Sequence, residues 1–271
     1  MSRRKPFLSV KRSHGLGNVF MLLPVLDGLV NEGYEVHLVT DSRWVRALRR
    51  LRPEYDLGVE CRAETVDLDS ATASLPPQAH RTEEFASILG VAAPRTPAKI
   101  CVPEEWRGGF LRWQGSIGFA PEAGHPSRRW PTEYAVRLAS ALKNSPLVLL
   151  GSDAAPALPC DFDSRARLSL EELLGLLSQL RLLICMDSGM LHLGAALDIP
   201  TVCLFGGIDP AYRIMEGQRV TALQAELNCC PCNKRETCGD KYDCMKALSP
   251  ESVLRAVEDR PGRARRVIRR V

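Results

Sequence analysis

The chain has 271 residues, 45% of them hydrophobic and 25% charged, with a formal net charge of +4. These values are ordinary for a folded, water-soluble protein, and the length is enough for one large core or two modest cores. No apolar run reaches the roughly 20 residues that a membrane-spanning helix needs. The N-terminus, MSRRKPFLSV, lacks the apolar region of a secretion signal, so we expect a cytoplasmic protein.

The first fifth of the chain alternates between short apolar runs and helical patterns. We predict strands at residues 7–10 and 35–41, and helices at residues 19–31 and 44–51. A glycine-containing loop, GLG at residues 15–17, joins the first strand to the first helix. This alternation is typical of a doubly wound α/β unit with a parallel sheet.

A weakly patterned region and a linker follow this unit. Residues 56–81 show only two short strand candidates, LGVEC and ETVDL, and residues 83–89 form a short helical pattern. Residues 91–106 contain repeated prolines, which is typical of a connection between domains.

A second α/β unit begins near residue 115. We predict strands at residues 116–121, 146–151, 165–170, 182–186 and 200–206, and helices at residues 132–142, 170–180 and 190–197. Pro250 stands in the first turn of a last helix, residues 251–258. We therefore expect an N-terminal domain over residues 1–105, a C-terminal domain over residues 115–250, and a terminal helix and basic tail over residues 251–271.

The segment from Met186 to Pro210 carries the most information about function. It has a buried strand, then Asp187 and Ser188 as helix-capping residue types, Gly189, and a helix with His192 in its first turn. A helix N-terminus attracts phosphate through its free N–H groups and its partial positive charge. The pattern thus favours a diphosphate site, although a well-capped βαβ unit without a ligand has the same pattern.

The same segment closely resembles the signature of glycosyltransferase family 9, the heptosyltransferases. That signature is a strand, D-[ST]-G-x-x-H, a helix of small residues, an IP-V strand and FGxTDP, and here Gly207 and Ile208 replace the usual pair. Four other segments resemble family elements in the same order, so that the resemblance covers most of the chain outside about residues 61–113: Phe7–Leu29, Gly118–Leu142, the helix beginning at Leu168, and Cys229–Val257. The resemblance implies the GT-B arrangement, in which two Rossmann-like domains face each other across a cleft. The N-terminal domain is shortened here, and the C-terminal part carries a cysteine-rich loop.

The resemblance also implies a set of donor-binding residues. Arg128 falls where the family has a phosphate-binding lysine, and arginine keeps that charge and adds a bidentate fork. Leu168 falls where the family lines the base pocket. The full donor set is Gly124, Arg128, Ser152, Asp153, Leu168, Asp187, Ser188, Gly189 and His192. The alternatives are a surface salt-bridging loop around Arg128 and a satisfied core histidine at position 192.

The loop HGLGN, residues 14–18, is expected to face the acceptor through Gly15, Gly17 and Asn18. Asn18 occupies the position where the family has an aspartate that serves as the general base, and an amide cannot take that proton. The base must then come from elsewhere, be a water, or be missing. By residue type alone the candidates are His14, Asp41, Glu122 and His125. Our candidate catalytic residues are Asn18, His14, Arg128 and His192.

Five of the ten cysteines lie within residues 229–244. Cys229, Cys232, Cys238 and Cys244 have the spacing C-x2-C-x5-C-x5-C, which suits a four-thiolate zinc or iron site of structural type. Cys230 is an alternative ligand, and free thiols are the alternative state. We predict no catalytic metal.

The sequence therefore predicts a glycosyltransferase that moves a sugar from a nucleotide-sugar donor to an acceptor hydroxyl. By resemblance the donor is ADP-heptose-like and transfer inverts the anomeric carbon. The sequence leaves three acceptor classes as alternatives: lipopolysaccharide core, protein and a hydroxymethylated nucleic-acid base. It also leaves open whether the chain forms a homo-oligomer. Residues 260–271 hold six arginines and no acid, which favours a solvated tail or, alternatively, contact with an anionic surface. The alternative functions are a nucleotide-sugar binder without transferase activity and a metal-stabilised nucleic-acid-binding module.

Overall fold

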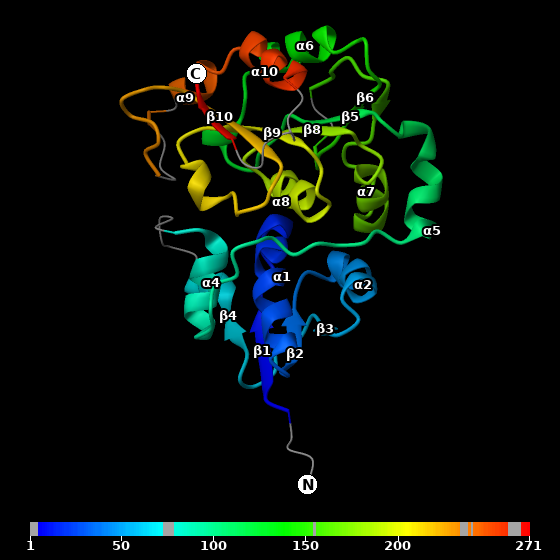
Figure 1. The fold of residues 1–271 in the computed structure, drawn as a ribbon, viewed down its shortest axis with the longest axis vertical. Coiled ribbons are helices and arrows are strands. Elements are labelled where there is room, and N and C mark those ends of the chain that lie inside the picture. Colours follow the sequence, from blue (N-terminus) through cyan, green and yellow to red (C-terminus); the bar gives the residue numbers. More distant parts are fainter. Residues whose placement is uncertain (1–4, 73–78, 154–155, 234–237, 240, 260–266) are drawn as a thin grey trace.

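The computed structural model describes residues 5–72, 79–153, 156–233, 238–239, 241–259 and 267–271. Its N-terminal unit is a four-stranded parallel sheet in the order β3-β2-β1-β4, drawn in the lower part of Figure 1. The strands are β1 (Phe7–Lys11), β2 (Glu35–Val39), β3 (Asp56–Gly58) and β4 (Val66–Asp67). The helices of this unit are α1 (Leu16–Asn31), α2 (Ser42–Leu51), α3 (Leu68–Ala71) and α4 (Arg81–Leu89).

The C-terminal unit is built on a seven-stranded parallel sheet in the order β11-β10-β9-β8-β5-β6-β7. Its strands are β5 (Ile117–Ala120), β6 (Leu147–Leu149), β7 (Phe162–Asp163), β8 (Leu182–Met186), β9 (Thr201–Phe205), β10 (Val220–Gln224) and β11 (Val267–Arg270). Its α-helices are α5 (Glu104–Arg107), α6 (Thr132–Ala141), α7 (Leu170–Leu177), α8 (Gly189–Ala196), α9 (Asp243–Lys246) and α10 (Pro250–Glu258). Three 3-10 helices complete it, η1 (Gly108–Trp113), η2 (Pro126–Arg128) and η3 (Pro210–Tyr212). Figure 1 shows α6 and α10 on the outer face of the sheet, with α7 and α8 on the face toward the N-terminal unit.

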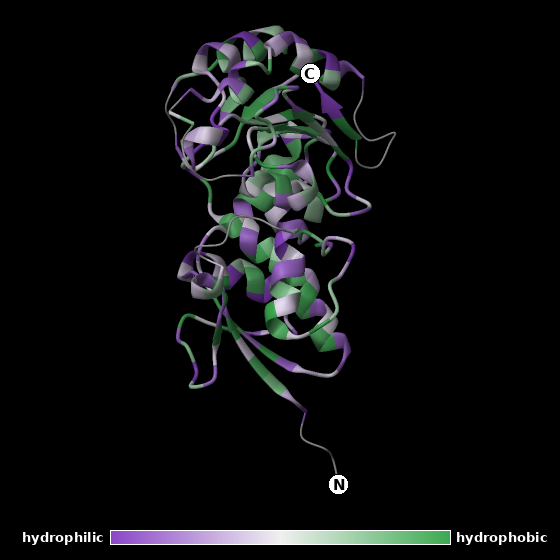
Figure 2. Ribbon diagram, turned by 90° about the vertical axis from the view of Figure 1, so that its left-hand side faces the viewer, coloured by the Kyte–Doolittle hydropathy of each residue, from purple (hydrophilic) through white to green (hydrophobic). Residues whose placement is uncertain are grey.

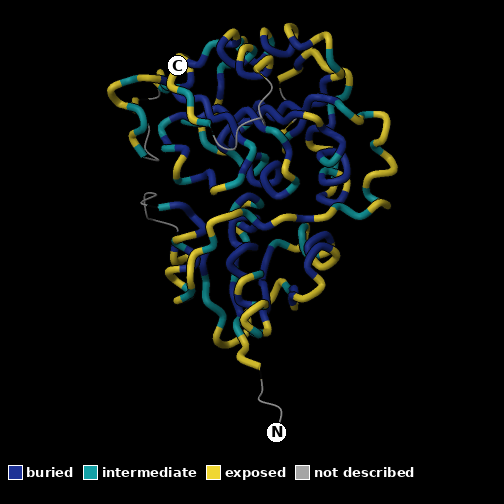
Figure 3. Tube along the Cα trace, viewed as in Figure 1, coloured by how far each residue is buried: buried dark blue, intermediate teal, exposed yellow. Residues whose placement is uncertain are grey.

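The central strands form because their residues are apolar on both faces. Every residue of β8 (LLICM) and β9 (TVCLF) is buried, as expected for strands covered by helices on both sides. Figure 2 shows hydrophobic residues concentrated in the strands of this sheet, and Figure 3 shows the same strands as buried. The predicted α/β fold with two parallel sheets is thereby confirmed.

The two units meet through helices α1 and α8. An added Cβ on Gly17, in the first turn of α1, would lie 2.8 Å from the Gly189 Cα and 2.8 Å from the His192 Cδ2. Only a residue without a side chain permits this approach, because real Cβ atoms do not come so close to backbone. The β1–α1 loop and the N-terminus of α8 therefore face each other at the junction of the units.

The connection between the units is held by hydrogen bonds to both of them. Arg52, at the end of α2, donates to the Lys99 carbonyl at 2.9 Å. Lys99 in turn donates to the Ala195 carbonyl at 3.0 Å and pairs with Asp198 at 2.7 Å. The predicted linker thus crosses between the units as an anchored segment.

Two predictions about the C-terminal unit are wrong. Residues 165–170 do not form a strand, because Arg165 turns inward to pair with Asp163 at 2.8 Å and Ala166 adopts a left-handed backbone with φ of 56°. The adjacent strand is β7 instead. The predicted solvated tail is also wrong for residues 267–270, which form β11 and pair with β10. Residues 260–266, which hold four of the six arginines, lie outside the described residues.

The domain boundaries that we predict, at residues 105, 115 and 250, stay predictions. Within the part of the chain that the structure describes, no helix is long and apolar enough to cross a membrane.

Candidate active site

Two cavities meet at the N-terminus of α8. Cavity one, about 710 Å³, lies between the β1–α1 loop, α3 and η2, and cavity two, about 850 Å³, lies between the β5–η2 segment and the loops that follow β6 and β7. Both cavities are lined by Leu16, Gly124, Ser188 and Gly189, so they adjoin along this helix end. The topology explains the location, since ligands of parallel α/β sheets bind outside the carboxyl ends of the strands.

The N-terminus of α8 has no side-chain cap. Ser188 is the N-cap residue, but its side chain accepts no hydrogen bond from the helix backbone. Its hydroxyl is buried and has no hydrogen-bond partner among the described residues. A buried hydroxyl and open helix N–H groups at the meeting point of two cavities form a binding place for an anion.

Asp187 does not cap this helix, and we correct that expectation. Its carboxylate is 2% exposed and lies between two arginines, 3.6 Å from the Arg128 Nη1 and 3.5 Å from the Arg213 Nε. Arg128 also donates to the Asp187 carbonyl at 2.9 Å. Because both guanidinium groups line cavity one, Asp187 holds two positive charges beside the helix N-terminus.

His192 lies in the same helix against Gly17 and is 7% exposed. Burial lowers the pKa of His192 well below its ordinary value, and the nearby His80, Arg213 and Arg128 lower it further. The imidazole is therefore neutral at neutral pH, so it offers one N–H donor and one lone pair to a ligand without adding charge.

Cavity two contains the remaining donor residues that the sequence predicts. Ser152, Asp153 and Leu168 line it, beside the shared Gly124. Glu122 also lines it and accepts from the Asp153 backbone N–H at 3.0 Å. Burial raises the pKa of Glu122, although the Asp153 N–H and Arg165 oppose that shift. The loops after β5, β6 and β7 thus form one wall, and the start of α8 forms the other.

The β1–α1 loop brings the predicted acceptor residues to cavity one. His14, Gly15, Gly17 and Asn18 all line it. Gly15 has φ of 75°, a backbone conformation that favours glycine, and it precedes the first residue of α1. The Asn18 amide donates to the His14 carbonyl at 3.3 Å, so it braces the loop.

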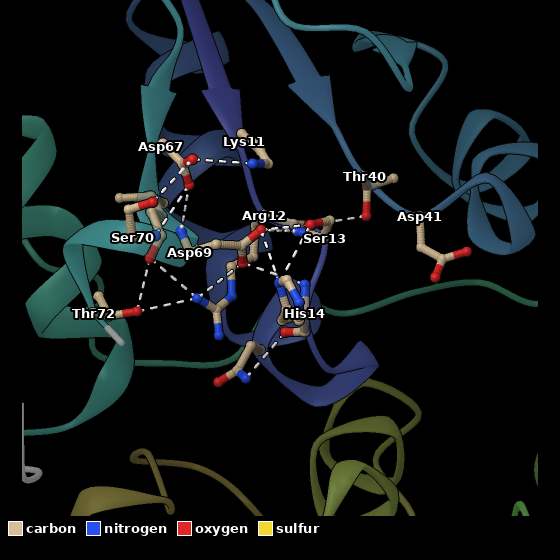
Figure 4. A network of polar contacts seen from close by, with 12 residues as sticks. Lys11, Arg12, Ser13, His14, Thr40, Asp41, Asp67, Asp69, Ser70 and Thr72 are labelled. Carbon is tan, nitrogen blue, oxygen red and sulfur yellow. Dashed lines mark hydrogen bonds and ion pairs between the residues drawn. The ribbon is translucent and has the colours of Figure 1, made fainter. Parts of the chain in front are cut away.

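Several charged residues of cavity one were not among the predicted site residues. Asp69 lies under the loop, and its carboxylate is 8% exposed and contacts Arg12 and His14 (Figure 4). The further missed lining residues are Lys11, Arg12, Arg81 and Arg213. The positions of three of these five residues could have suggested them. Lys11 and Arg12 lie at the carboxyl end of β1, and Arg213 lies in the loop after the GGIDP segment. Asp69 and Arg81 come from the weakly patterned stretch, which offered no signal.

Two of the four residue-type candidates for the base are placed away from cavity one. Asp41 caps α2 and pairs with Arg43 at 2.7 Å, and it lines neither cavity. Glu122 lines cavity two only. His14 and His125 both line cavity one.

The predicted four-cysteine metal site is not assembled. Among the described residues, no three His, Cys, Asp or Glu side chains converge to hold a metal ion. Instead the Cys230 thiol hydrogen-bonds with Cys244 and donates to the Gly206 carbonyl at 3.3 Å. The Cys238 sulfur accepts from the Tyr242 N–H at 3.3 Å. Cys230 and Cys238 thus have separate partners, and the four predicted ligands do not converge in this structure.

A model of glycosyltransferase family 9 (heptosyltransferase) matches residues 85–243, more than half of the chain. The chain belongs to glycosyltransferase family 9. The resemblance that the signature segment indicated is thereby confirmed.

Other family 9 proteins match this chain over parts of their length. Lipopolysaccharide heptosyltransferase 1 of Pseudomonas aeruginosa is 39% identical over 72 residues, which are 27% of this chain and 20% of that protein. Lipooligosaccharide heptosyltransferase 2 of Haemophilus influenzae is 24% identical over 163 residues, which are 53% of this chain and 46% of that protein. The matched segments span less than half the length of these curated relatives.

Solved family structures share the fold over nearly the whole chain. The iron-containing dodecameric glycosyltransferase TibC of enterotoxigenic E. coli has a TM-score of 0.78 at 14% identity, covering 95% of this chain and 76% of that chain. The glycosyl transferase family 9 structure from Veillonella parvula has a TM-score of 0.75 at 17% identity, covering 96% of this chain and 98% of that chain. At these identities the likeness shows the GT-B fold.

Proposed function

We propose that this family 9 chain transfers a sugar from an ADP-heptose-like nucleotide sugar to an acceptor hydroxyl. The observation that carries the proposal is the uncapped N-terminus of α8, where the buried Ser188 hydroxyl and two arginines held by Asp187 surround the junction of two cavities. A nucleoside diphosphate sugar has the matching shape, with the nucleoside on one side of the diphosphate and the transferred sugar on the other. The ADP-heptose-like donor is suggested by TibC, which has been solved with ADP-D-β-D-heptose.

In this proposal cavity two holds the nucleoside. Leu168 contributes an apolar wall, and Ser152 and Asp153 contribute polar groups. The diphosphate lies on the N–H groups of Ser188 and Gly189 and against Arg128. The sugar then extends into cavity one, where His192 and Asp187 contact it.

The same groups stabilise the reaction. As the bond between the anomeric carbon and the phosphate oxygen breaks, negative charge grows on the leaving diphosphate. Arg128, Arg213 and the positive end of α8 are already in place to stabilise that charge, which lowers the barrier without reorganisation. The acceptor enters cavity one from the opposite side, which gives inversion at the anomeric carbon.

The acceptor class stays open among lipopolysaccharide core, protein and a hydroxymethylated nucleic-acid base. Each presents a hydroxyl, and cavity one accepts any hydroxyl that its loop residues can position.

Calorimetric titration with ADP, UDP, GDP and CDP tests the donor site. We expect ADP to bind, and Arg128→Ala to weaken binding by about 1.5–3 kcal/mol because a charge-assisted phosphate contact is lost. Arg137→Ala is the matched control, since Arg137 is exposed, pairs with Glu251 and lines neither cavity. Failure of all four diphosphates to bind would reject the proposal.

A nucleotide-sugar binder without transferase activity is the second candidate, and Asn18 motivates it. Asn18→Asp restores the family's acidic residue. A gain in ADP release from ADP-heptose would indicate a lapsed enzyme, whereas no change or a loss would indicate another base.

A nucleic-acid-binding module is the third candidate, motivated by the arginine-rich C-terminus. Affinity for DNA that falls steeply between 50 and about 200 mM salt would favour it, because each phosphate contact releases a counterion. An affinity that hardly changes over this range would count against it.

We propose a structural zinc or iron site in the cysteine segment on the strength of its C-x2-C-x5-C-x5-C spacing, although the described thiols do not converge in this structure. TibC is described as iron-containing and dodecameric, and the cysteine segment 229–244 is where this chain would hold zinc or iron. Elemental analysis of the purified protein measures the metal content directly, with Cys232→Ala removing a predicted ligand and Cys61→Ala as control. Light scattering of the same samples measures the oligomeric state.

A further inference from the structure

Asp69 forms a buried anchor for the loop that carries His14. Its carboxylate accepts the Ser13 hydroxyl at 2.5 Å, the Ser13 N–H at 2.9 Å and the His14 N–H at 3.2 Å. The Arg12 Nη1 lies 3.2 Å from Asp69 Oδ1, the oxygen that also accepts the His14 N–H. Burial raises the pKa of Asp69, but the hydrogen bonds from Ser13 and His14 outweigh it and leave that pKa lowered. Asp69 is therefore ionised at neutral pH and can only accept hydrogen bonds.

The network decides which nitrogen of His14 carries the proton. The His14 Nδ1 lies 3.3 Å from the Asp69 Oδ2 and 3.5 Å from the Ser13 Oγ. Since the Ser13 proton is used on Asp69, both neighbours of Nδ1 are acceptors, and Nδ1 must be the donor. The lone pair then lies on Nε2, on a ring that is 83% exposed and lines cavity one.

The other titratable groups of cavity one are engaged elsewhere. Among the described lining residues the only other carboxylate is Asp187, which is buried between Arg128 and Arg213. The His125 Nδ1 is 2.8 Å from the Ser127 hydroxyl on the Arg128 side. His192 is buried in α8. His14 alone of these groups stands on the acceptor loop with an exposed ring.

We propose that His14 is the general base for the acceptor and that Asp69 is its positioning residue, in place of the carboxylate that Asn18 lacks. This inference rests on the proposed transferase function. The acceptor oxygen attacks the anomeric carbon, and its proton moves to the His14 Nε2. The bond from the anomeric carbon to the phosphate oxygen breaks, and the leaving nucleoside diphosphate takes the electron pair. Asp69 stabilises the imidazolium through Nδ1–H, and the proton later passes to water.

The first test needs no substrate. Two-dimensional ¹H–¹⁵N spectra of the imidazole rings, with His14→Gln for assignment, report the tautomer at a pH where free imidazole is neutral. We expect His14 to carry its proton on Nδ1 in the wild type and to lose this preference in Asp69→Asn. An Nε2–H tautomer in the wild type, or one unchanged by Asp69→Asn, would overturn the proposal.

The second test measures ADP release from ADP-heptose, with water alone and with bacterial lipopolysaccharide as acceptors. We expect His14→Gln to lower kcat by ~10²-fold to ~10⁴-fold, and Asp69→Asn by ~10²-fold, while the ADP affinity changes less than about two-fold. Asp56→Asn is the matched control. It removes a carboxylate of the same unit that pairs with Arg62 and lines neither cavity, and the rate should stay within about three-fold.

Failure of the donor proposal and failure of the His14–Asp69 pair give different results. If the wild type binds no ADP, the donor proposal is rejected, and the tautomer measurement still tests the pairing of His14 with Asp69. If His14→Gln turns over normally, the role of His14 as the base is rejected, and the donor site stands.

Discussion

Gly17 is the residue on which the contact between the two units depends. Its missing side chain lets α1 and α8 approach through backbone, and this places the acceptor loop opposite the donor helix. The site is therefore built from two sequence-distant glycines as much as from its charged groups.

We expect Gly17→Ala to destabilise the protein by about 1–3 kcal/mol, because the new methyl group would overlap the Gly189 backbone and the His192 ring. Urea unfolding measures the change, and calorimetry should show weaker ADP binding. Gly28→Ala is the control in the same helix. An added Cβ meets nothing there, so we expect it to be neutral or to stabilise by about 0.5–1 kcal/mol. Equal effects of the two substitutions would contradict the packing argument.

At the scale of elements, the four-residue helix α3 is held in place by polar contacts at its start. Asp67 is its N-cap and accepts from the backbone N–H groups of Asp69 and Ser70. It also pairs with Lys11 at the end of β1, at 3.0 Å. These contacts tie the helix that carries Asp69 to the strand that carries the acceptor loop.

This anchoring should depend on pH. The hydrogen bond from Lys11 lowers the pKa of Asp67 from 3.8 to about 2, and the Ser70 backbone contact adds to it. Because the folded value is below the unfolded one, the stabilisation is fully present above about pH 4 and is lost as the pH falls toward 2. We expect the free energy of unfolding to change less between pH 5 and pH 3 in Asp67→Asn than in the wild type. Lys11→Met removes the group that lowers the pKa of Asp67, so the free energy of unfolding should depend less on pH in this variant too. If both variants keep the wild-type pH dependence, the Lys11–Asp67 pair is not its cause.

At the scale of the whole molecule, the C-terminus closes one edge of the larger sheet. β11 pairs with β10, and Val271 exchanges backbone hydrogen bonds with Gln224 and Glu226 at 3.0 and 2.8 Å. Arg269 pairs with Asp259 at 2.6 Å, and Arg270 contacts the Gln224 side chain. These last two arginines therefore have partners inside the fold.

Deleting residues 267–271 should lower the Tm by on the order of 5 °C, since several ladder hydrogen bonds are lost and the β10 edge becomes free to pair with other chains. Differential scanning calorimetry measures the Tm, and light scattering should show more aggregation. The comparison is a triple alanine variant of Arg263, Arg265 and Arg266, outside the described residues, which keeps β11 and removes charge. If only the triple variant lowers the Tm, the edge-strand role is wrong. A loss of binding to anionic vesicles in the triple variant would support the contact with an anionic surface.

The sequence by itself determined most of the central strands and helices, and it predicted the candidate donor residues of the signature segment. Buried strands such as β8 and β9 are apolar throughout, and the D-S-G-x-x-H signature is contiguous, so local pattern suffices to find Ser188, Gly189 and His192. Only the tertiary structure decided the partners of these residues. Asp187 meets Arg213 instead of capping its helix, Arg165 turns inward where a strand was predicted, and Asp69 comes from a weakly patterned stretch to lie beneath His14. The reason is physical: periodicity records which face of an element is buried, whereas charge pairing joins residues 26 to 59 positions apart, and no local pattern encodes that distance.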